Sequence, residues 1–127
     1  YGVGLALDLT LRDVQQKLKD KGQPWERAKA FDGACPVSCF TPLGDSAELG
    51  NLDFSLTING EVRQKGNTKL MMRDALSLLC AISQVFTLQP GDIVLTGTPK
   101  GVGPLHPGDS LHLKMASWFD ILTQVGE

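Results

Sequence analysis

The sequence predicts an α+β protein built on a mixed β-sheet, with short helices at the periphery of that sheet. Segments with the short apolar or alternating pattern of strands outnumber those with the 3.6-residue apolar period of helices. Asn59-Gly60 stands between two strand-like segments, which is the strongest short-range signal for a β-hairpin. Pro-Gly-Asp turns at 90–92 and 107–109 lead into expected strands at 93–96 and 110–113. Strands joined by turns, with only two helical patterns among them, favour the α+β class.

The first 22 residues contain one expected strand and one expected helix. Residues 1–9 are apolar, spaced by glycines and too short for a helix, so we expect a buried strand that ends at Asp8. Thr10 is the expected N-cap of the following helix, with Asp13 as its capping-box partner and Gly22 as the residue that ends it. The apolar positions of this helix are Leu11, Val14 and Leu18.

The middle of the chain predicts a hairpin followed by a helix. Residues 54–58 alternate between apolar and polar, and residues 61–64 form the second strand after the Asn-Gly turn. Residues 70–85 carry an apolar stripe at helical spacing, with an expected cap near Asn67 or Thr68.

Composition excludes several classes of protein. The chain has 127 residues, 42% of them hydrophobic and 20% charged, which are the values of a globular domain. A net charge of −2 gives no electrostatic reason to expect nucleic acid or an anionic membrane as partner. The longest apolar stretch, 75–86, is interrupted by polar residues and too short to cross a bilayer, and no signal peptide opens the chain. We therefore expect a soluble protein.

The cysteines and the first residue suggest where the chain works and how much of it is present. Cys35, Cys39 and Cys80 do not complete a zinc site, because no second Cys/His pair accompanies them. We expect reduced, buried thiols in a reducing compartment. The chain begins with Tyr1 in the middle of an expected strand, so an N-terminal portion of the domain is expected to be missing.

Three polar residues gather where the first expected strand meets the first expected helix. Asp8 lies at the exit of the strand, and Arg12 and Gln15, three residues apart, share one face of the helix. A carboxylate, a forked cation and an amide clustered at a strand–helix junction suit a metal-bound carboxylate substrate. The alternative is a surface helix with ordinary solvated polar residues.

Lys29 and a later glycine-rich loop are further candidates. Lys29 is flanked by small or apolar residues, which suits an ammonium that stabilises an enolate, although a surface lysine has the same pattern. The loop at 95–104 presents backbone N–H groups and the hydroxyls of Thr96 and Thr98, which suits a carboxylate or phosphate; a rigid turn is the alternative. We interpret His106 and His112 as ordinary residues, because no triad partners stand in register with them.

Taken together, these segments resemble the fumarylacetoacetate hydrolase family, particularly its short acylpyruvate hydrolases and oxaloacetate decarboxylases or tautomerases. The most specific motifs are the Asp-x₃-Arg-x₂-Gln pattern that begins at Asp8 and the Thr-Gly-Thr-Pro loop at 96–99. These motifs lie within the matching segments, which are 5–15, 22–32, 35–37, 59–64 and 88–104. The resemblance implies the mixed-sheet roll or sandwich of the family's catalytic domain, with residues 1–127 as its C-terminal portion.

The resemblance also implies a role for each candidate residue. Asp8 looks like the third carboxylate ligand of Mg²⁺ or Mn²⁺, and Lys29 like the active-site lysine beside the metal. Arg12 and Gln15 look like residues that hold the substrate, and Thr98 like the loop threonine that meets the substrate carboxylate. The family's other two metal ligands, a Glu-x-Glu pair, and its His/Glu catalytic dyad would precede the first residue. The remaining acids that match no family ligand position are Asp32, Asp45, Glu48, Asp92 and Asp109.

The implied activity is that of a metal-dependent enzyme on small 2-oxo acids. Such an enzyme hydrolyses the C–C bond of acylpyruvates, or decarboxylates or tautomerises oxaloacetate, through an enolate that the metal stabilises. The alternatives are an isomerase or decarboxylase of 2-oxo acids from aromatic catabolism, and a non-catalytic ligand-binding domain that has lost its metal site. The resemblance further implies a homodimer in the cytoplasm, or in mitochondria if the source is eukaryotic.

Overall fold

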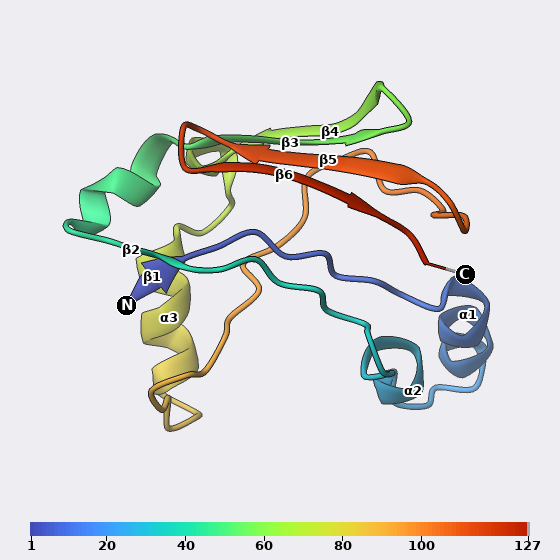
Figure 1. Cartoon of the computed structure of the whole chain (residues 1–127). Coiled ribbons are helices and arrows are strands. Elements are labelled where there is room, and N and C mark those ends of the chain that lie inside the picture. The colour runs from blue at the N-terminus through green and yellow to red at the C-terminus, as the bar shows by residue number, and fades with distance from the viewer. Residues whose placement is uncertain (127) are drawn as a thin grey trace. The chain divides into compact units, whose positions relative to one another are not determined.

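The computed structural model describes residues 1–126, and the side chains of all of these except residues 46–48. The chain divides into two compact units. The sheet unit comprises Tyr1–Val3 and Thr41–Glu127, of which residue 127 lies outside the described residues, and the helical unit comprises Gly4–Phe40. Figure 1 shows the elements of both units.

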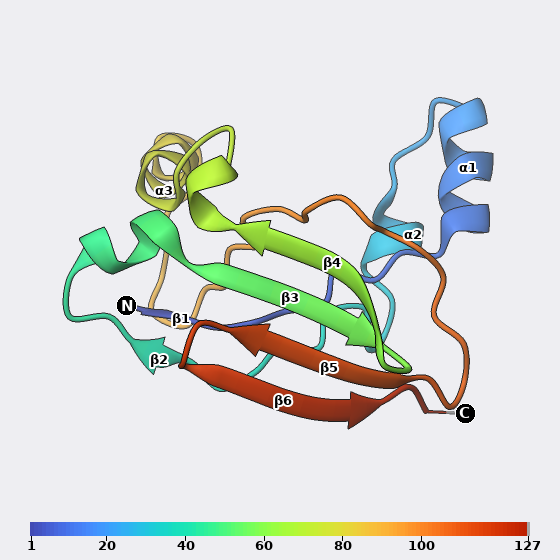
Figure 2. The ribbon, with the colours of Figure 1, turned by 90° about the horizontal axis from the view of Figure 1, so that it is seen from above.

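The sheet unit is built on a four-stranded sheet in the order β4-β3-β5-β6. Its strands are β3 (Asp53–Ile58), β4 (Glu61–Asn67), β5 (Ser110–Met115) and β6 (Phe119–Gln124), and Figure 2 shows them from above. A smaller sheet pairs β1 (Gly2–Val3) with β2 (Thr41–Pro42). All strand pairs in the described part of the chain are antiparallel. The α+β class is confirmed, but the described sheets are antiparallel where the sequence had predicted a mixed sheet.

The hairpin between β3 and β4 forms at the predicted Asn-Gly pair. Asn59 and Gly60 both have positive φ, of 50° and 84°, which is the geometry of a type I′ turn. The strands on either side are those that the alternation predicted, and β4 continues to Asn67. Apolar side chains from β3 and its neighbours then form the core of this unit. Its buried hydrophobic residues are Leu52, Ile58, Leu111, Leu113, Met115 and Phe119.

Of the two strands expected after Pro-Gly-Asp turns, the structure contains one. The strand predicted at 110–113 is β5, and β6 pairs with it after a turn in which Ala116 has a φ of 46°. Residues 93–96 form no strand, because no strand among the described residues pairs with them. An apolar run predicts a strand only where a partner is present to accept its backbone hydrogen bonds.

The helix predicted at 70–85 is shorter and is preceded by a separate turn. Asn67 does act as a cap, but its side chain accepts from the Lys69 amide at the start of a 3₁₀ turn, η2 (Thr68–Leu70). The α-helix, α3 (Ala75–Ser83), begins instead after Asp74, whose carboxylate accepts from the Ser77 amide and hydroxyl. These two bonds hold the pKa of Asp74 below its usual range. Another 3₁₀ segment, η1, spans Ser46–Asn51.

The helical unit contains α1 (Arg12–Asp20) and α2 (Glu26–Lys29). The predicted N-cap at Thr10 is wrong: Leu11 occupies the cap position of α1 and makes no side-chain cap bond. The predicted end is confirmed, because Gly22 has a φ of 61° and its amide donates to the Lys19 carbonyl. The next amide, of Gln23, donates to the Leu18 carbonyl, which completes a Schellman motif.

The strand predicted at 1–9 is only partly realised. Strand structure is confined to β1 and to one isolated bridge between Ala6 and Val37. Around this bridge, Leu5, Leu7 and Leu9 make separate backbone hydrogen bonds to residues within 34–38.

The three cysteines of the chain are exposed in the structure. Cys35, Cys39 and Cys80 are free thiols, as predicted, but all three are exposed, so their predicted burial is wrong. Each stands next to apolar residues, and that context does not by itself bury a side chain. No helix in the described part of the chain is long and apolar enough to cross a membrane.

Candidate active site

The extended segment that carries Asp8 is held in place by backbone hydrogen bonds on both sides of it. The Leu7 amide donates to the Pro36 carbonyl at 3.0 Å, and the Leu9 amide donates to the Ala34 carbonyl at 2.9 Å. Ala34 is itself buried, so this anchor lies in the core of the helical unit. The backbone on either side of Asp8 is therefore fixed, while its side chain remains exposed.

A second set of contacts fixes the start of α1 against α2. The Leu11 amide donates to the Ala28 carbonyl at 3.1 Å, and Ala28 is fully buried. Lys29 directly follows this buried residue, at the last position of α2. The base of the Lys29 side chain is thus as well anchored as the backbone around Asp8.

The two anchored residues meet in an ion pair. Lys29 Nζ lies 2.9 Å from Asp8 Oδ1, although the two residues are 21 positions apart in the sequence. Their side chains are 35% and 41% exposed, and an ion pair this open to solvent contributes at most about 1 kcal/mol to folding. An ammonium has three N–H donors, and the pair uses one of them. The arrangement therefore places a cation with spare donors beside an exposed carboxylate.

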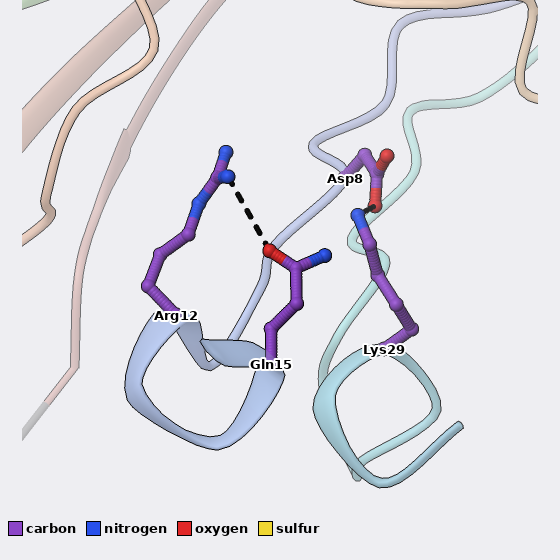
Figure 3. Close-up of polar contacts among 4 residues, drawn as sticks. All are labelled: Asp8, Arg12, Gln15 and Lys29. Atoms are coloured by element: carbon purple, nitrogen blue, oxygen red, sulfur yellow. Dashed lines mark hydrogen bonds and ion pairs between the residues drawn. The ribbon is translucent and has the colours of Figure 1, made fainter. Parts of the chain in front are cut away.

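Arg12 and Gln15 lie on the first turn of α1, as their spacing predicted. Arg12 Nη1 donates to Gln15 Oε1 over 3.5 Å, which is long for a hydrogen bond and easily exchanged for another acceptor. In Figure 3 the side chains of Arg12, Gln15 and Lys29 rise to the same side of their helices, the side on which Asp8 lies. The helical unit thus brings together four of the five predicted site residues. It presents a forked cation, an amide, an ammonium and a carboxylate on one exposed surface.

The fifth candidate, Thr98, belongs to the sheet unit and lies in a loop without helix or strand. Thr98 is exposed. In the same loop, Gly97 and Gly101 have φ values of 120° and 101°, which residues other than glycine rarely adopt. The Gln64 side-chain amide donates to the Pro99 carbonyl at 3.1 Å, so the loop is attached to β4 immediately after Thr98.

The described residues supply the right kind of metal ligand but too few of them. An exposed carboxylate such as that of Asp8 is the hard oxygen donor that Mg²⁺ and Mn²⁺ prefer. However, the described residues contain no group of three or more His, Cys, Asp or Glu side chains that could hold a metal ion. The side chain of Glu48, one of the acids without a predicted ligand role, lies outside the described residues. The carboxylate of Asp8 is therefore not part of a complete metal site within the described residues.

Sequence reasoning missed one polar cluster, on the exposed face of the sheet. Asp120 accepts from His112 Nε2 at 2.6 Å, and its other oxygen lies 3.0 Å from Lys114 Nζ. The bond to His112, and then that to Lys114, hold the pKa of Asp120 below its usual range. Pairing of β5 with β6 could have suggested this cluster, but β6 itself was not predicted. The other histidine, His106, donates its backbone amide to Asp109 in the turn before β5.

The fold is that of a domain of an established enzyme family. The family described as fumarylacetoacetate (FAA) hydrolase, C-terminal, matches residues 1–126. The chain therefore belongs to the fumarylacetoacetate hydrolase family.

Individual relatives within the family are named as oxaloacetate tautomerases. The chain is 55% identical over 111 residues to the oxaloacetate tautomerase YcgM of Escherichia coli, covering 87% of this chain and 51% of that protein. It is 46% identical over 110 residues to the human mitochondrial oxaloacetate tautomerase FAHD1, covering 87% of this chain and 50% of that protein. The chain thus spans about half the length of the curated relatives it matches.

Solved structures agree with the fold. A fumarylacetoacetate hydrolase family protein from Yersinia pestis superimposes with a TM-score of 0.91 at 51% identity, covering 98% of this chain and 58% of that one. A fumarylpyruvate hydrolase from Pseudomonas aeruginosa, in complex with Mn²⁺ and pyruvate, gives a TM-score of 0.92 at 31% identity, covering 99% of this chain and 54% of that one.

Proposed function

We propose that this chain is part of a divalent-metal-dependent enzyme that tautomerises or decarboxylates oxaloacetate. The observation that carries the proposal is the exposed cluster in which Lys29 meets Asp8 beside Arg12 and Gln15. The relatives add support, since those at 55% and 46% identity are named oxaloacetate tautomerases. The proposed activity is that of a whole protein of the relatives' length, and this chain matches about half of that length.

The cluster suits a small dianionic 2-oxo acid. The Arg12 guanidinium carries five N–H donors in a planar fork, which matches the two oxygens of a carboxylate. Gln15 adds an amide that can both donate and accept, and it frames the same space above α1. Arg12 and Gln15 hold the substrate, and the long bond between them exchanges for bonds to it.

Lys29 has the role of stabilising the charge that develops during the reaction. When oxaloacetate tautomerises, one proton leaves C3 and one proton arrives at the 2-oxo oxygen, so the C2–C3 bond becomes double and the composition is unchanged. Negative charge gathers on the 2-oxo oxygen between these two transfers. We propose that the two N–H donors of Lys29 that Asp8 does not occupy donate to this oxygen and stabilise it electrostatically.

Asp8 has the role of one metal ligand. Mg²⁺ or Mn²⁺ is proposed because a carboxylate is a hard oxygen donor and because the P. aeruginosa relative is described with Mn²⁺ and pyruvate. When bound, the ion supplies Lewis acidity. We propose that the remaining metal ligands are a Glu-x-Glu pair that precedes Tyr1 in the whole protein. The His/Glu catalytic dyad is proposed to precede Tyr1 as well. Residues 1–127 are then the C-terminal portion of one catalytic domain.

A second reaction, hydrolysis of an acylpyruvate such as fumarylpyruvate, is favoured by one observation. The P. aeruginosa structure is that of a fumarylpyruvate hydrolase, and its likeness covers 99% of this chain. Its identity is 31%, against 55% for the E. coli oxaloacetate tautomerase, so we place the hydrolase reaction second.

The test uses the full-length protein with three assays before and after metal removal. Purified protein is assayed for oxaloacetate tautomerisation, oxaloacetate decarboxylation and fumarylpyruvate hydrolysis with Mg²⁺, with Mn²⁺, and after dialysis against EDTA. We expect oxaloacetate turnover that falls at least a hundredfold in EDTA and returns with either ion. Turnover unchanged by EDTA would refute the metal dependence. Absence of turnover in every assay would favour the non-catalytic binding domain.

Assembly and location are part of the same proposal. We propose a homodimer, to be checked by analytical ultracentrifugation of the full-length protein. We propose that it works in the cytoplasm of a bacterium or, since the human relative is named as mitochondrial, in mitochondria of a eukaryote. Fluorescence microscopy of a tagged full-length protein in its source organism checks this.

A further inference from the structure

The loop that carries Thr98 runs along an irregular part of the sheet edge. β4 is the outer strand of the four-stranded sheet, and Figure 2 shows the orange loop segment beside it. The pairing of β4 with β3 shifts at one point: Leu56 pairs with Gln64, but the next residue, Thr57, pairs with Val62. Arg63 is therefore an extra residue in β4, which is a β-bulge. A bulge on an edge strand redirects backbone and side-chain groups away from the regular ladder.

The backbone of the bulge is in close contact with the loop. A Cβ atom added to Gly101 would lie 2.0 Å from the Arg63 carbonyl oxygen, far inside any real contact distance. Gly101 also has a φ of 101°, which favours glycine. The loop can approach the bulge in this way only because residue 101 has no side chain.

The residue after the bulge makes the second contact. Gln64 is half-buried, and its side-chain amide donates to the Pro99 carbonyl at 3.1 Å across 35 positions of sequence. Gln64 thus holds the loop at Pro99, and Gly101 lies close to the Arg63 carbonyl. Thr98 directly precedes Pro99.

We propose that Gln64 is a positioning residue that sets the place of the Thr98 hydroxyl by holding the loop at Pro99. This inference rests on the proposed function and on the role that the family resemblance implies for Thr98, which is contact with the substrate carboxylate. Gln64 itself does not touch substrate. Its loss removes the hydrogen bond at Pro99 and lets Thr98 move, which weakens substrate binding more than it slows the chemical step.

The chain offers a matched control for this hydrogen bond. The Gln124 side-chain amide donates to the Gly108 carbonyl, also at 3.1 Å, from β6 to a different turn. Gln64→Leu and Gln124→Leu therefore remove the same kind of bond of the same length, and only the first attaches the Thr98 loop. Gln64→Glu keeps the shape of the side chain and removes the donor, so it serves if the leucine variant folds poorly.

The first measurement reports how firmly the loop is held and does not depend on enzyme activity. Lys100 is exposed within the loop, so trypsin cleavage after Lys100, followed by mass spectrometry of the full-length protein, reports how well the loop is held. We expect Gln64→Leu and Gln64→Glu to raise the rate of this cleavage severalfold, while Gln124→Leu leaves it at the wild-type rate. Equal cleavage in wild type and both Gln64 variants would overturn the inference.

The second measurement asks whether Gln64 acts through Thr98. Losing one hydrogen bond of ordinary strength should raise KM for oxaloacetate about three- to tenfold in Gln64→Leu, with kcat nearly unchanged. In a Thr98→Ala background the same change should have little further effect, because the hydroxyl to be positioned is gone. Multiplied effects in the double variant would overturn the inference. If Thr98→Ala alone leaves KM unchanged, the proposed function of Thr98 fails and the positioning role fails with it, whereas the trypsin result still reports on the anchor.

Discussion

Two carboxylates in this molecule each meet a lysine at nearly the same distance, yet they differ in what brings the partners together. In the helical unit Lys29 lies 2.9 Å from Asp8, and in the sheet unit Lys114 lies 3.0 Å from Asp120. Lys114 and Asp120 are direct partners in the register of β5 and β6, so regular strand pairing places them together. No strand register joins Asp8 to Lys29, which come from an extended segment and from the end of a short helix.

Strand pairing explains why one of these ion pairs forms, and it does not explain the other. Opposite charges on facing strands favour strand pairing, which is sufficient cause for the Asp120 cluster. The Asp8–Lys29 pair depends on backbone anchors at Leu7, Leu9 and Ala28. Both ion pairs are open to solvent, so neither contributes much to stability. We therefore propose a chemical role for the Asp8–Lys29 pair and a structural role for the Asp120 cluster.

The largest effect is expected from Asp8. Asp8→Ala in the full-length protein should lose the divalent metal and at least a hundredfold of the oxaloacetate turnover, because it removes a proposed metal ligand. Asp120→Ala removes a carboxylate of the same size and should retain both. Elemental analysis and steady-state kinetics on the two variants measure this. Full metal content in Asp8→Ala would show that the ligand role is wrong.

The two lysines should differ next. Lys29→Ala is expected to keep the metal and to lower kcat by about two to three orders of magnitude, as removal of a principal electrostatic stabiliser does. Lys114→Ala removes an equal charge from the sheet and should change kcat less than twofold. The readouts are metal content and kcat. Metal loss in Lys29→Ala comparable with that in Asp8→Ala would mean that Lys29 supports the ligand and not the reaction.

A smaller effect is expected in the loop of the sheet unit. Thr98→Ala should raise KM for oxaloacetate about tenfold and leave kcat nearly unchanged, because its proposed partner is a carboxylate whose charge does not change in the reaction. Thr123→Ala, on exposed β6, is the control. Initial rates over a range of oxaloacetate concentrations separate the two constants. A fall in kcat at constant KM would instead move Thr98 to the reacting centre.

Local sequence signals predicted the elements that local interactions decide. The Asn59-Gly60 turn, the Gly22 helix end and the shared face of Arg12 and Gln15 each depend on a few neighbouring residues, and the structure contains all three. The Thr10 cap failed because Leu11 took the cap position, and nothing in the spacing distinguishes the two.

Features that need a distant partner could not be predicted in the same way. Residues 93–96 have the composition of a strand, but pairing decides whether they become one. The Asp8–Lys29 contact spans 21 positions and the Gln64–Pro99 contact spans 35, so no periodicity could reveal them. The resemblance to the family named the residues of the candidate site, whereas the ion pair that joins two of them came from the structure.

The smallest expected effect concerns the stability of the sheet and its dependence on pH. Asp120 is hydrogen-bonded to His112 and Lys114, and these bonds hold its pKa below the ordinary value of 3.8. A carboxyl whose pKa is lowered in the folded state binds fewer protons there than in the unfolded state. Its contribution is therefore fully present well above pH 3.8 and is lost as the pH falls toward the lowered native pKa.

Asp120→Asn removes this titration and should reduce the urea midpoint of the full-length protein slightly at pH 6. The difference from wild type should shrink as the pH falls from 5 toward 3, because the unfolded wild-type chain then takes up a proton at Asp120 that the folded state, with its lowered pKa, resists. Urea unfolding at several pH values, with EDTA present throughout so that metal loss does not contribute, measures this difference. A difference that stays constant from pH 6 to pH 3 would show that the cross-strand contacts of Asp120 do not depend on its charge. Asp120 would then stabilise the pairing of β5 with β6 through hydrogen bonds that do not need its charge. It would differ from Asp8 both in its place in the fold and in not acting through its charge.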